Sequence, residues 1–256
     1  MSLDACAALV ERGDPDRFAA VLAAPRAARA PLLVLYAFNL EVARAPWASA
    51  EPLVAQMRLQ WWRDTLAAVA SGAARAHDVA GPLHDLIRDR ALPVDVADRL
   101  VAARLPDCWG EAPADEDALA AYLDDTGGGL MWLAARALGA PAAAEGVARD
   151  LGRALGAANL LRASAELAAR GRPMLPDPSV GGVRRLARQG QGWLAAARRA
   201  RAALGPGRPA ALAAWPAAPL LAQAARDPAA VAEGRLALSE FARRGRLAWV
   251  GLTGGW

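Results

Sequence analysis

Lysine is absent from this chain, and cysteine is scarce. All 30 basic residues are arginines, a bias that a GC-rich bacterial genome explains without any structural demand. The two cysteines, Cys6 and Cys108, are far apart and match neither the spacing of a zinc site nor that of a CxxC redox pair. So few cysteines exclude a disulfide framework and indicate a reducing compartment.

Long apolar runs are also missing. No uncharged stretch reaches the roughly 20 residues that a membrane-spanning helix needs. The longest, 209–225, contains Pro216 and Pro219, which disfavour a straight helix and indicate two shorter packed helices. An acidic residue, Asp4, occurs among the first residues, and no basic stretch followed by a long apolar run is present there. We therefore expect no signal peptide. The expected location is cytoplasmic, with a peripheral position on the inner membrane as the alternative.

The composition favours helices over strands. Hydrophobic residues make up 55% of the chain but aromatic residues only 5%, and β-branched runs typical of strands are rare. The 30 basic residues are interleaved with 26 acidic ones, which gives a net charge of only +4. This balance argues against nucleic acid as a partner, and the composition predicts an all-α protein.

Helical periodicity runs along almost the whole chain. Asp14, Asp115 and Ser179 each stand where an N-cap residue should, before an apolar-periodic run. We predict one domain over residues 1–256, with its core at about 16–243 and a glycine-rich tail at 251–256. The predicted helices are 15–24, 31–46, 50–71, 77–90, 94–106, 115–138, 142–170, 181–204, 208–225 and 229–245.

Two of these helices look like the walls of a diphosphate site without its acids. Residues 39, 43 and 47 lie one turn apart on one helix face, where carboxylates would have to sit to hold Mg²⁺ against a diphosphate. In this chain the three positions are Asn39, Ala43 and Trp47. On the second helix, Asn159 and Ala163 share a face in the same manner. Acids one turn apart would be needed there at Ala163 and Leu167, and only Glu166 lies beside these two places.

Four short segments, taken in order, resemble the squalene/phytoene synthase family. They are Tyr36-Ala37-Phe38, Gln60-Trp61-Trp62-Arg63, Asn159-Leu160-Leu161-Arg162 and Ala169-Arg170-Gly171-Arg172. The resemblance implies a single-domain, all-α isoprenoid-synthase-like helical bundle around a central cavity. Active members of that family condense two prenyl diphosphates head to head. The ligand or cavity residues that it implies are Tyr36, Phe38, Asn39, Arg58, Gln60, Trp61, Tyr122, Asn159, Arg162 and Arg172.

The chain departs from the family at the metal-binding acids. By resemblance, the three acids of the first motif fall on Ala43, Arg44 and Trp47, and the two of the second on Ala163 and Leu167. Without carboxylates Mg²⁺ has too few hard oxygen ligands to bridge protein and diphosphate. We therefore expect no metal and no cofactor.

A divergent branch of the family resembles this chain most, through the segments Ala37-Phe38-Asn39, Arg58-Leu59-Gln60-Trp61-Trp62-Arg63 and Leu161-Arg162-Ala163. It includes a mitochondrial assembly factor of respiratory complex I and bacterial relatives. This resemblance implies a non-catalytic role in assembling an NADH:quinone oxidoreductase. The implied partners are a prenyl or quinone-like lipid and a complex I subunit or assembly intermediate.

One alternative stays open, namely an active Mg²⁺-dependent prenyltransferase that condenses prenyl diphosphates with substitute acids. Such an enzyme would have to gather several carboxylates at one cavity mouth. Whether the chain is an enzyme is thus undecided by the sequence, and the non-catalytic interpretation is favoured. The acids available for the alternative are Glu41, Asp124, Asp125 and Glu166.

Overall fold

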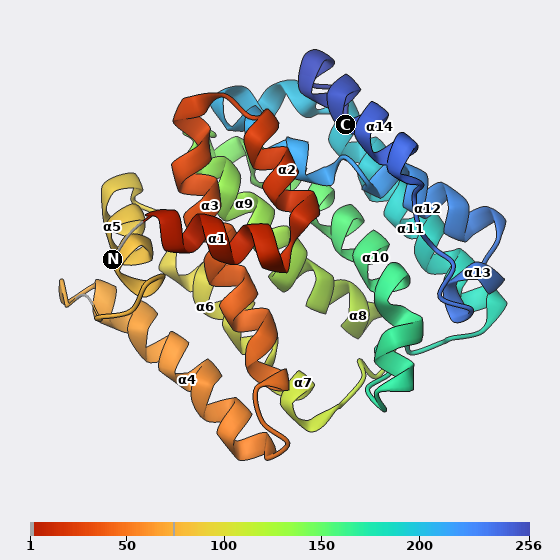
Figure 1. The fold of residues 1–256 in the computed structure, drawn as a ribbon, viewed down its shortest axis with the longest axis horizontal. Helices are drawn as coiled ribbons and strands as arrows, with labels where there is room; N and C mark the ends of the chain where they lie inside the picture. The colour runs from red at the N-terminus through yellow and green to blue at the C-terminus, as the bar shows by residue number, and fades with distance from the viewer. Residues whose placement is uncertain (1–2, 74) are drawn as a thin grey trace.

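The computed structural model describes residues 3–73 and 75–256, and within these ranges it contains helices and no strand (Figure 1). None of the described helices is long and apolar enough to cross a membrane. The helices are α1 (Leu3–Gly13), α2 (Pro15–Ala23), α3 (Arg26–Arg44), η1 (Ala45–Trp47), α4 (Pro52–Val69), α5 (Ala80–Arg90), α6 (Val94–Ala102), α7 (Leu105–Trp109), α8 (Glu116–Leu123), η2 (Asp124–Gly128), α9 (Gly129–Ala137), η3 (Ala142–Ala144), α10 (Glu145–Ala169), α11 (Val180–Arg199), η4 (Arg201–Ala214), α12 (Ala217–Arg226), α13 (Ala229–Ala232) and α14 (Glu240–Thr253).

Three helix starts follow from their capping residues, as predicted. The Asp14 carboxylate accepts a hydrogen bond from the backbone N–H of Arg17 at 3.0 Å, at the start of α2. Asp115 caps α8 and Ser179 caps α11 in the same way, through backbone N–H groups three residues further on. Each cap satisfies a donor that the first helical turn leaves without a partner.

The centre of the molecule is formed by α3, α9 and α10, around which the other helices pack (Figure 1). In α3, every residue from Leu32 to Leu40 is buried, so this helix has no solvent face along that stretch. The helix begins at Arg26, earlier than predicted, and carries Pro31 inside. Pro31 has no backbone N–H, so the helix lacks one hydrogen bond at this buried position.

The predicted helix 115–138 is interrupted by a π-helical segment, η2. Within it, the Thr126 hydroxyl donates to the carbonyl of Tyr122 at 2.6 Å. Gly127 and Gly128 approach the backbone of α10 at Gly152 so closely that no Cβ would fit at Gly152. The wider π turn thus accompanies a backbone contact that only glycine permits.

The C-terminal third differs most from the sequence prediction. The region 208–225, where the prolines indicated two shorter packed helices, forms the end of the 3₁₀ segment η4 and then α12. Gly205, which precedes it, has a φ of +48°. The predicted helix 229–245 is replaced by α13 and α14, separated by a break after Gly234, whose φ is +67°. Helix α1 has no counterpart in the prediction, and α14 extends into the predicted tail, where Trp256 is buried.

Candidate functional site

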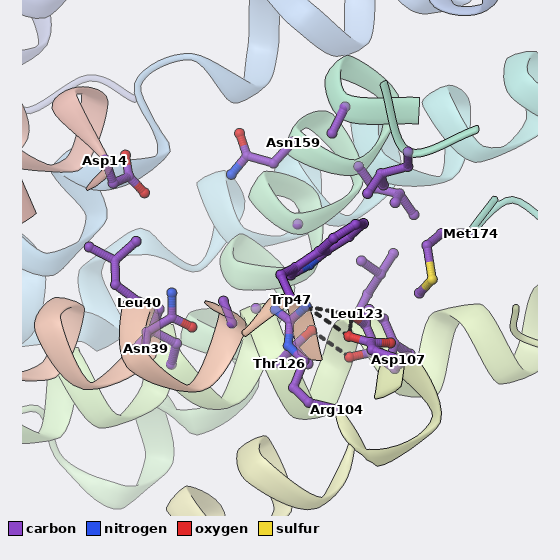
Figure 2. A pocket seen from close by; sticks show the side chains of 18 of the residues that line it. Asp14, Asn39, Leu40, Trp47, Arg104, Asp107, Leu123, Thr126, Asn159 and Met174 are labelled. Carbon is purple, nitrogen blue, oxygen red and sulfur yellow. Dashed lines mark hydrogen bonds and ion pairs between the residues drawn. The ribbon is translucent and has the colours of Figure 1, made fainter. Parts of the chain in front are cut away.

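A cavity of about 310 Å³ lies between α3 and α10. This volume falls at the lower end of the range of small-molecule pockets, about 300–1,000 Å³. Figure 2 shows its walls, which come from helices far apart in the chain. The lining residues are Asp14, Arg17, Asn39, Leu40, Ala43, Trp47, Arg104, Asp107, Gly110, Tyr122, Leu123, Thr126, Gly127, Leu130, Gly156, Asn159, Leu160, Ala163, Leu167, Arg172 and Met174.

Four of the five positions where the family resemblance places metal-binding acids face this cavity. They are Ala43 and Trp47 on the α3 side and Ala163 and Leu167 on α10. These two faces oppose one another across the cavity, and all four side chains are apolar. The fifth position, Arg44, lies outside this cavity and lines a second groove, on another face of α3.

An interlocked polar group forms one wall (Figure 2). The Tyr122 hydroxyl donates to a carboxylate oxygen of Asp107 at 2.9 Å, and Arg104 lies 3.3 Å from the same oxygen. Burial raises the pKa of Asp107 above its ordinary value, against the opposing effect of Arg104. Burial also raises the pKa of Tyr122, which therefore stays a neutral phenol at physiological pH.

Arg172 holds the Trp47 indole in place. The Arg172 guanidinium donates to the carbonyls of Pro46 and Asp107 at 2.8 and 3.1 Å. It also lies 4.5 Å from the centroid of the Trp47 ring, a cation–π distance. The tryptophan consequently forms a fixed apolar wall of the cavity.

Two carboxamides also line the cavity, Asn39 from α3 and Asn159 from α10 (Figure 2). Asn159 Oδ1 accepts a hydrogen bond from Arg162 at 3.1 Å. Asn39 is only 7% exposed. Near them, Asp14 and Arg17 form an ion pair at 2.8 Å. This part of the cavity therefore presents neutral amides beside a paired charge.

The structure brings Asn39, Tyr122, Asn159 and Arg172, four of the residues implied by the family resemblance, to this one cavity. Several others lie elsewhere, which corrects the expectation. Phe38 is fully buried in the core and packs edge-on against Trp62, with ring centroids 5.3 Å apart.

Three further residues expected in the cavity have other environments. Tyr36 is buried beneath Arg17, and burial raises its pKa to about 12. Gln60 is exposed and donates to Asp64 at 2.8 Å. Arg162 lies outside the cavity lining and pairs with Asp16 at 2.8 Å. Their motif segments are close to the cavity, but their side chains leave the helices in other directions.

A second groove, of about 350 Å³, accounts for the remaining pair of expected cavity residues. Arg58 and Trp61 line it together with Glu41 and Arg44. Trp61 packs edge-on against Trp62 at 5.0 Å and lies 5.2 Å from the ring of His77. Of the ten residues expected in the cavity, four line it, two line the second groove and four line neither.

The substitute acids of the enzyme alternative are not gathered at the cavity. Asp124 pairs with Arg149 at 2.9 Å, and Asp125 lies 3.7 Å from Arg99. Glu166 pairs with Arg170 at 2.6 Å, and Glu41 faces the second groove. Within residues 3–73 and 75–256, no group of three or more His, Cys, Asp or Glu side chains is placed to hold a metal ion.

Sequence reasoning missed the Arg104–Asp107 pair and the cavity role of Asp14 and Arg17. The sequence identified Asp14 only as the residue that caps a helix, and the structure shows that it does cap α2. Arg104 and Asp107 flank and occupy the five-residue helix α7, a segment without a motif or periodicity. Arg104 and Asp107 pair locally, at a spacing of three residues, and the Tyr122 hydroxyl of α8 contacts both of them. This tertiary contact, which the sequence did not predict, joins the pair to Tyr122 in the cavity wall.

A family model described as squalene/phytoene synthase matches residues 10–178, well over half of the chain. The chain belongs to the squalene/phytoene synthase family. The matched range includes both helices that form the main walls of the cavity, α3 and α10. The family assignment made from short motifs is therefore confirmed.

Two curated proteins are similar to this squalene/phytoene synthase-family chain. The bovine protein (Bos taurus) named NADH dehydrogenase (ubiquinone) complex I, assembly factor 6 is 26% identical over 172 residues, covering 67% of this chain and 52% of the bovine protein. A Drosophila melanogaster homologue of that factor is 39% identical over 62 residues, covering 24% of this chain and 19% of the Drosophila protein. The chain thus spans about half the length of the bovine relative.

Solved structures of two synthases share the fold. A dehydrosqualene synthase in complex with a ligand superimposes with a TM-score of 0.80 at 15% identity, covering 97% of this chain and 94% of its own. The squalene synthase HpnC from Alicyclobacillus acidocaldarius superimposes with a TM-score of 0.75 at 19% identity. The superposition covers 88% of this chain and 93% of HpnC. The predicted single-domain, all-α isoprenoid-synthase fold is confirmed.

Proposed function

We propose that this squalene/phytoene synthase-family protein is a non-catalytic lipid-binding factor that acts in the assembly of a respiratory NADH:quinone oxidoreductase. The observation that carries the proposal is the apolar character of the cavity positions Ala43, Trp47, Ala163 and Leu167. Its biological setting is supported by similarity to the proteins named complex I assembly factor 6. The partner is a subunit or an assembly intermediate of that complex.

The physical argument against catalysis concerns the leaving group. Ionising a prenyl diphosphate needs strong stabilisation of the departing charge, which carboxylate-held Mg²⁺ supplies by acting as a Lewis acid. The two carboxylates that line this cavity, Asp14 and Asp107, are each held in an ion pair with an arginine. Among the described residues, neither belongs to a group of three or more side chains that could hold a metal ion.

The argument for lipid binding concerns the rest of the wall. Leu40, Leu123 and Leu130 add to the apolar surface around Trp47. Burying apolar area contributes roughly 25 cal/mol per Å², so a prenyl chain that fills the cavity would gain several kcal/mol from this wall. The cavity therefore favours a ligand with an apolar chain.

The catalytic question is tested with purified protein, farnesyl or geranylgeranyl diphosphate, and Mg²⁺. We expect no release of diphosphate and no extractable condensation product above the protein-free control. Formation of product at enzymatic rates would overturn the non-catalytic part of the proposal.

The role in assembly is tested by deleting the gene and measuring NADH:quinone oxidoreductase activity and complex size in membranes. We expect loss of the full-size complex, restored by the unaltered protein but not by Ala163→Phe, which fills the cavity. Ala169→Phe is the matched control, because Ala169 is exposed on the same helix. Full-size complex in the deletion strain would contradict the assembly role, whereas rescue by Ala163→Phe would contradict only the role of the cavity.

A further inference from the structure

Asn39 is a buried carboxamide whose side chain has no hydrogen-bond partner among the described residues. It is 7% exposed and lies on α3, where all neighbours from Leu32 to Leu40 are buried as well. Its amide is not sealed inside the protein, because the residue lines the cavity (Figure 2). Burying a polar group without a partner is costly, so such an amide in a cavity wall points to a polar atom of a ligand.

A second carboxamide reaches the same cavity from the facing helix. Asn159 Oδ1 is occupied by the hydrogen bond from Arg162, and its amide nitrogen has no protein acceptor among the described residues. A carboxamide offers both donors and an acceptor and carries no charge. Together the two residues present donors and an acceptor that match a hydroxyl or a carbonyl oxygen.

The charges in the cavity wall are already used by the protein. Asp14 pairs with Arg17, and Asp107 pairs with Arg104. The fifth charged residue, Arg172, donates to two backbone carbonyls. Arg172 is the one cation of the described lining that no carboxylate pairs with, so a multiply charged head group would lose its hydration and gain at most one free counter-charge.

We infer that the cavity selects an isoprenoid whose polar end is uncharged, an alcohol or a carbonyl compound, and that Asn39 holds this oxygen in preference to a diphosphate. The inference rests on the proposed lipid binding and adds the chemistry of the head group. The apolar chain lies against Trp47 and the leucines of the wall, and the oxygen lies between the Asn39 and Asn159 amides. Metal ions play no part in this recognition.

The test compares three compounds that share one chain length: farnesol, farnesyl diphosphate and the hydrocarbon farnesene. Each is titrated into the purified protein, and binding is followed by calorimetry, with the summed fluorescence of the nine tryptophans as a second signal. We expect farnesol to bind at least about tenfold more tightly than farnesyl diphosphate, with or without Mg²⁺. Equal or tighter binding of the diphosphate would overturn the inference.

Asn39→Leu removes the amide and keeps the side chain close to its original size. We expect it to weaken farnesol binding by roughly tenfold while farnesene binding is unchanged, which shows at the same time that the cavity is still folded. Gln60→Leu is the matched control, because it removes an exposed carboxamide outside the cavity and should leave all three affinities unaltered.

The possible failures are distinguishable. If Asn39→Leu binds farnesol as tightly as the unaltered protein, or if farnesene and farnesol bind equally, the assignment of the head group is wrong and lipid binding stands. If none of the three compounds binds, the proposed lipid binding itself is wrong, and the inference fails with it.

Discussion

The contact between Gly152 of α10 and the π-helical segment η2 allows a sharp prediction for Gly152→Ala. A Cβ at this position would lie 2.6 Å from the carbonyl carbon of Gly127 and 2.7 Å from the Cα of Gly128. Ordinary carbon contacts are about 3.5–4.0 Å, so the two backbones would have to separate by about 1 Å. Both obstacles are backbone atoms, and no side-chain rotation can relieve the clash.

The free energy follows from two opposing effects. Overpacking costs about 1–3 kcal/mol, and a clash with backbone belongs at the upper end, about 3 kcal/mol. Alanine regains about 1 kcal/mol through its higher helix propensity. The net loss in the free energy of unfolding is therefore about 2 kcal/mol. For a chain of this size, that lowers the Tm by roughly 4–8 °C.

Urea and thermal unfolding followed by circular dichroism measure this loss. The control is Gly146→Ala in the first turn of the same helix, where a Cβ would meet no atom within 4 Å. Its stability should be unchanged or higher by up to about 1 kcal/mol. If Gly152→Ala is as stable as Gly146→Ala, the close approach of α10 and η2 is not real and the reasoning fails.

Two other measurements test buried polar groups. Burial raises the pKa of Asp16, but hydrogen bonds from Arg162 and Arg243 outweigh this effect and hold the pKa below its ordinary value. The Asp16 carboxylate therefore stabilises the fold above about pH 4. This stability is lost as the pH falls through the lowered pKa. Asp16→Asn should therefore lower the free energy of urea unfolding by about 1–3 kcal/mol at pH 7, and a deficit that persists undiminished at pH 3 would contradict this assignment. Burial raises the pKa of the Cys6 thiol to about 11, so iodoacetamide at pH 8 should label it slowly in the native protein and quickly in urea, as mass spectrometry can record. Rapid labelling of the native protein would show that Cys6 is accessible.

The sequence predicts helices well where local chemistry determines them. Asp14, Asp115 and Ser179 cap helices as expected, because their hydrogen bonds join residues only three positions apart. The break at Gly205 falls in the predicted gap between the helices 181–204 and 208–225, whereas the break at Gly234 lies inside the predicted helix 229–245 and was missed. A glycine tolerates both helical and left-handed backbone conformations, and long-range packing decides between them.

In the candidate site, too, the residues that helical spacing determines were predicted, and those that depend on tertiary contacts were not. Helical spacing placed Asn39 and Ala43 on one face, and the structure finds both in the cavity wall. Phe38 was included because it belongs to the same motif, yet neighbouring residues on a helix point about 100° apart, and it packs into the core. Arg104 and Asp107 pair at a local spacing of three residues, but their contact with Tyr122 of α8 is long-range, and no local pattern in the sequence predicts it.

The π turn at Asp124–Gly128 also constrains the length of the chain at this point. Removing one residue from it would turn everything that follows by about 100° relative to α8. Leu130 would then leave the cavity wall, while Leu123 before the turn would remain in it. This short stretch sets the rotation of α9 relative to α8, and both helices contribute to one cavity. Insertions and deletions there should therefore be tolerated less well than many substitutions of single side chains.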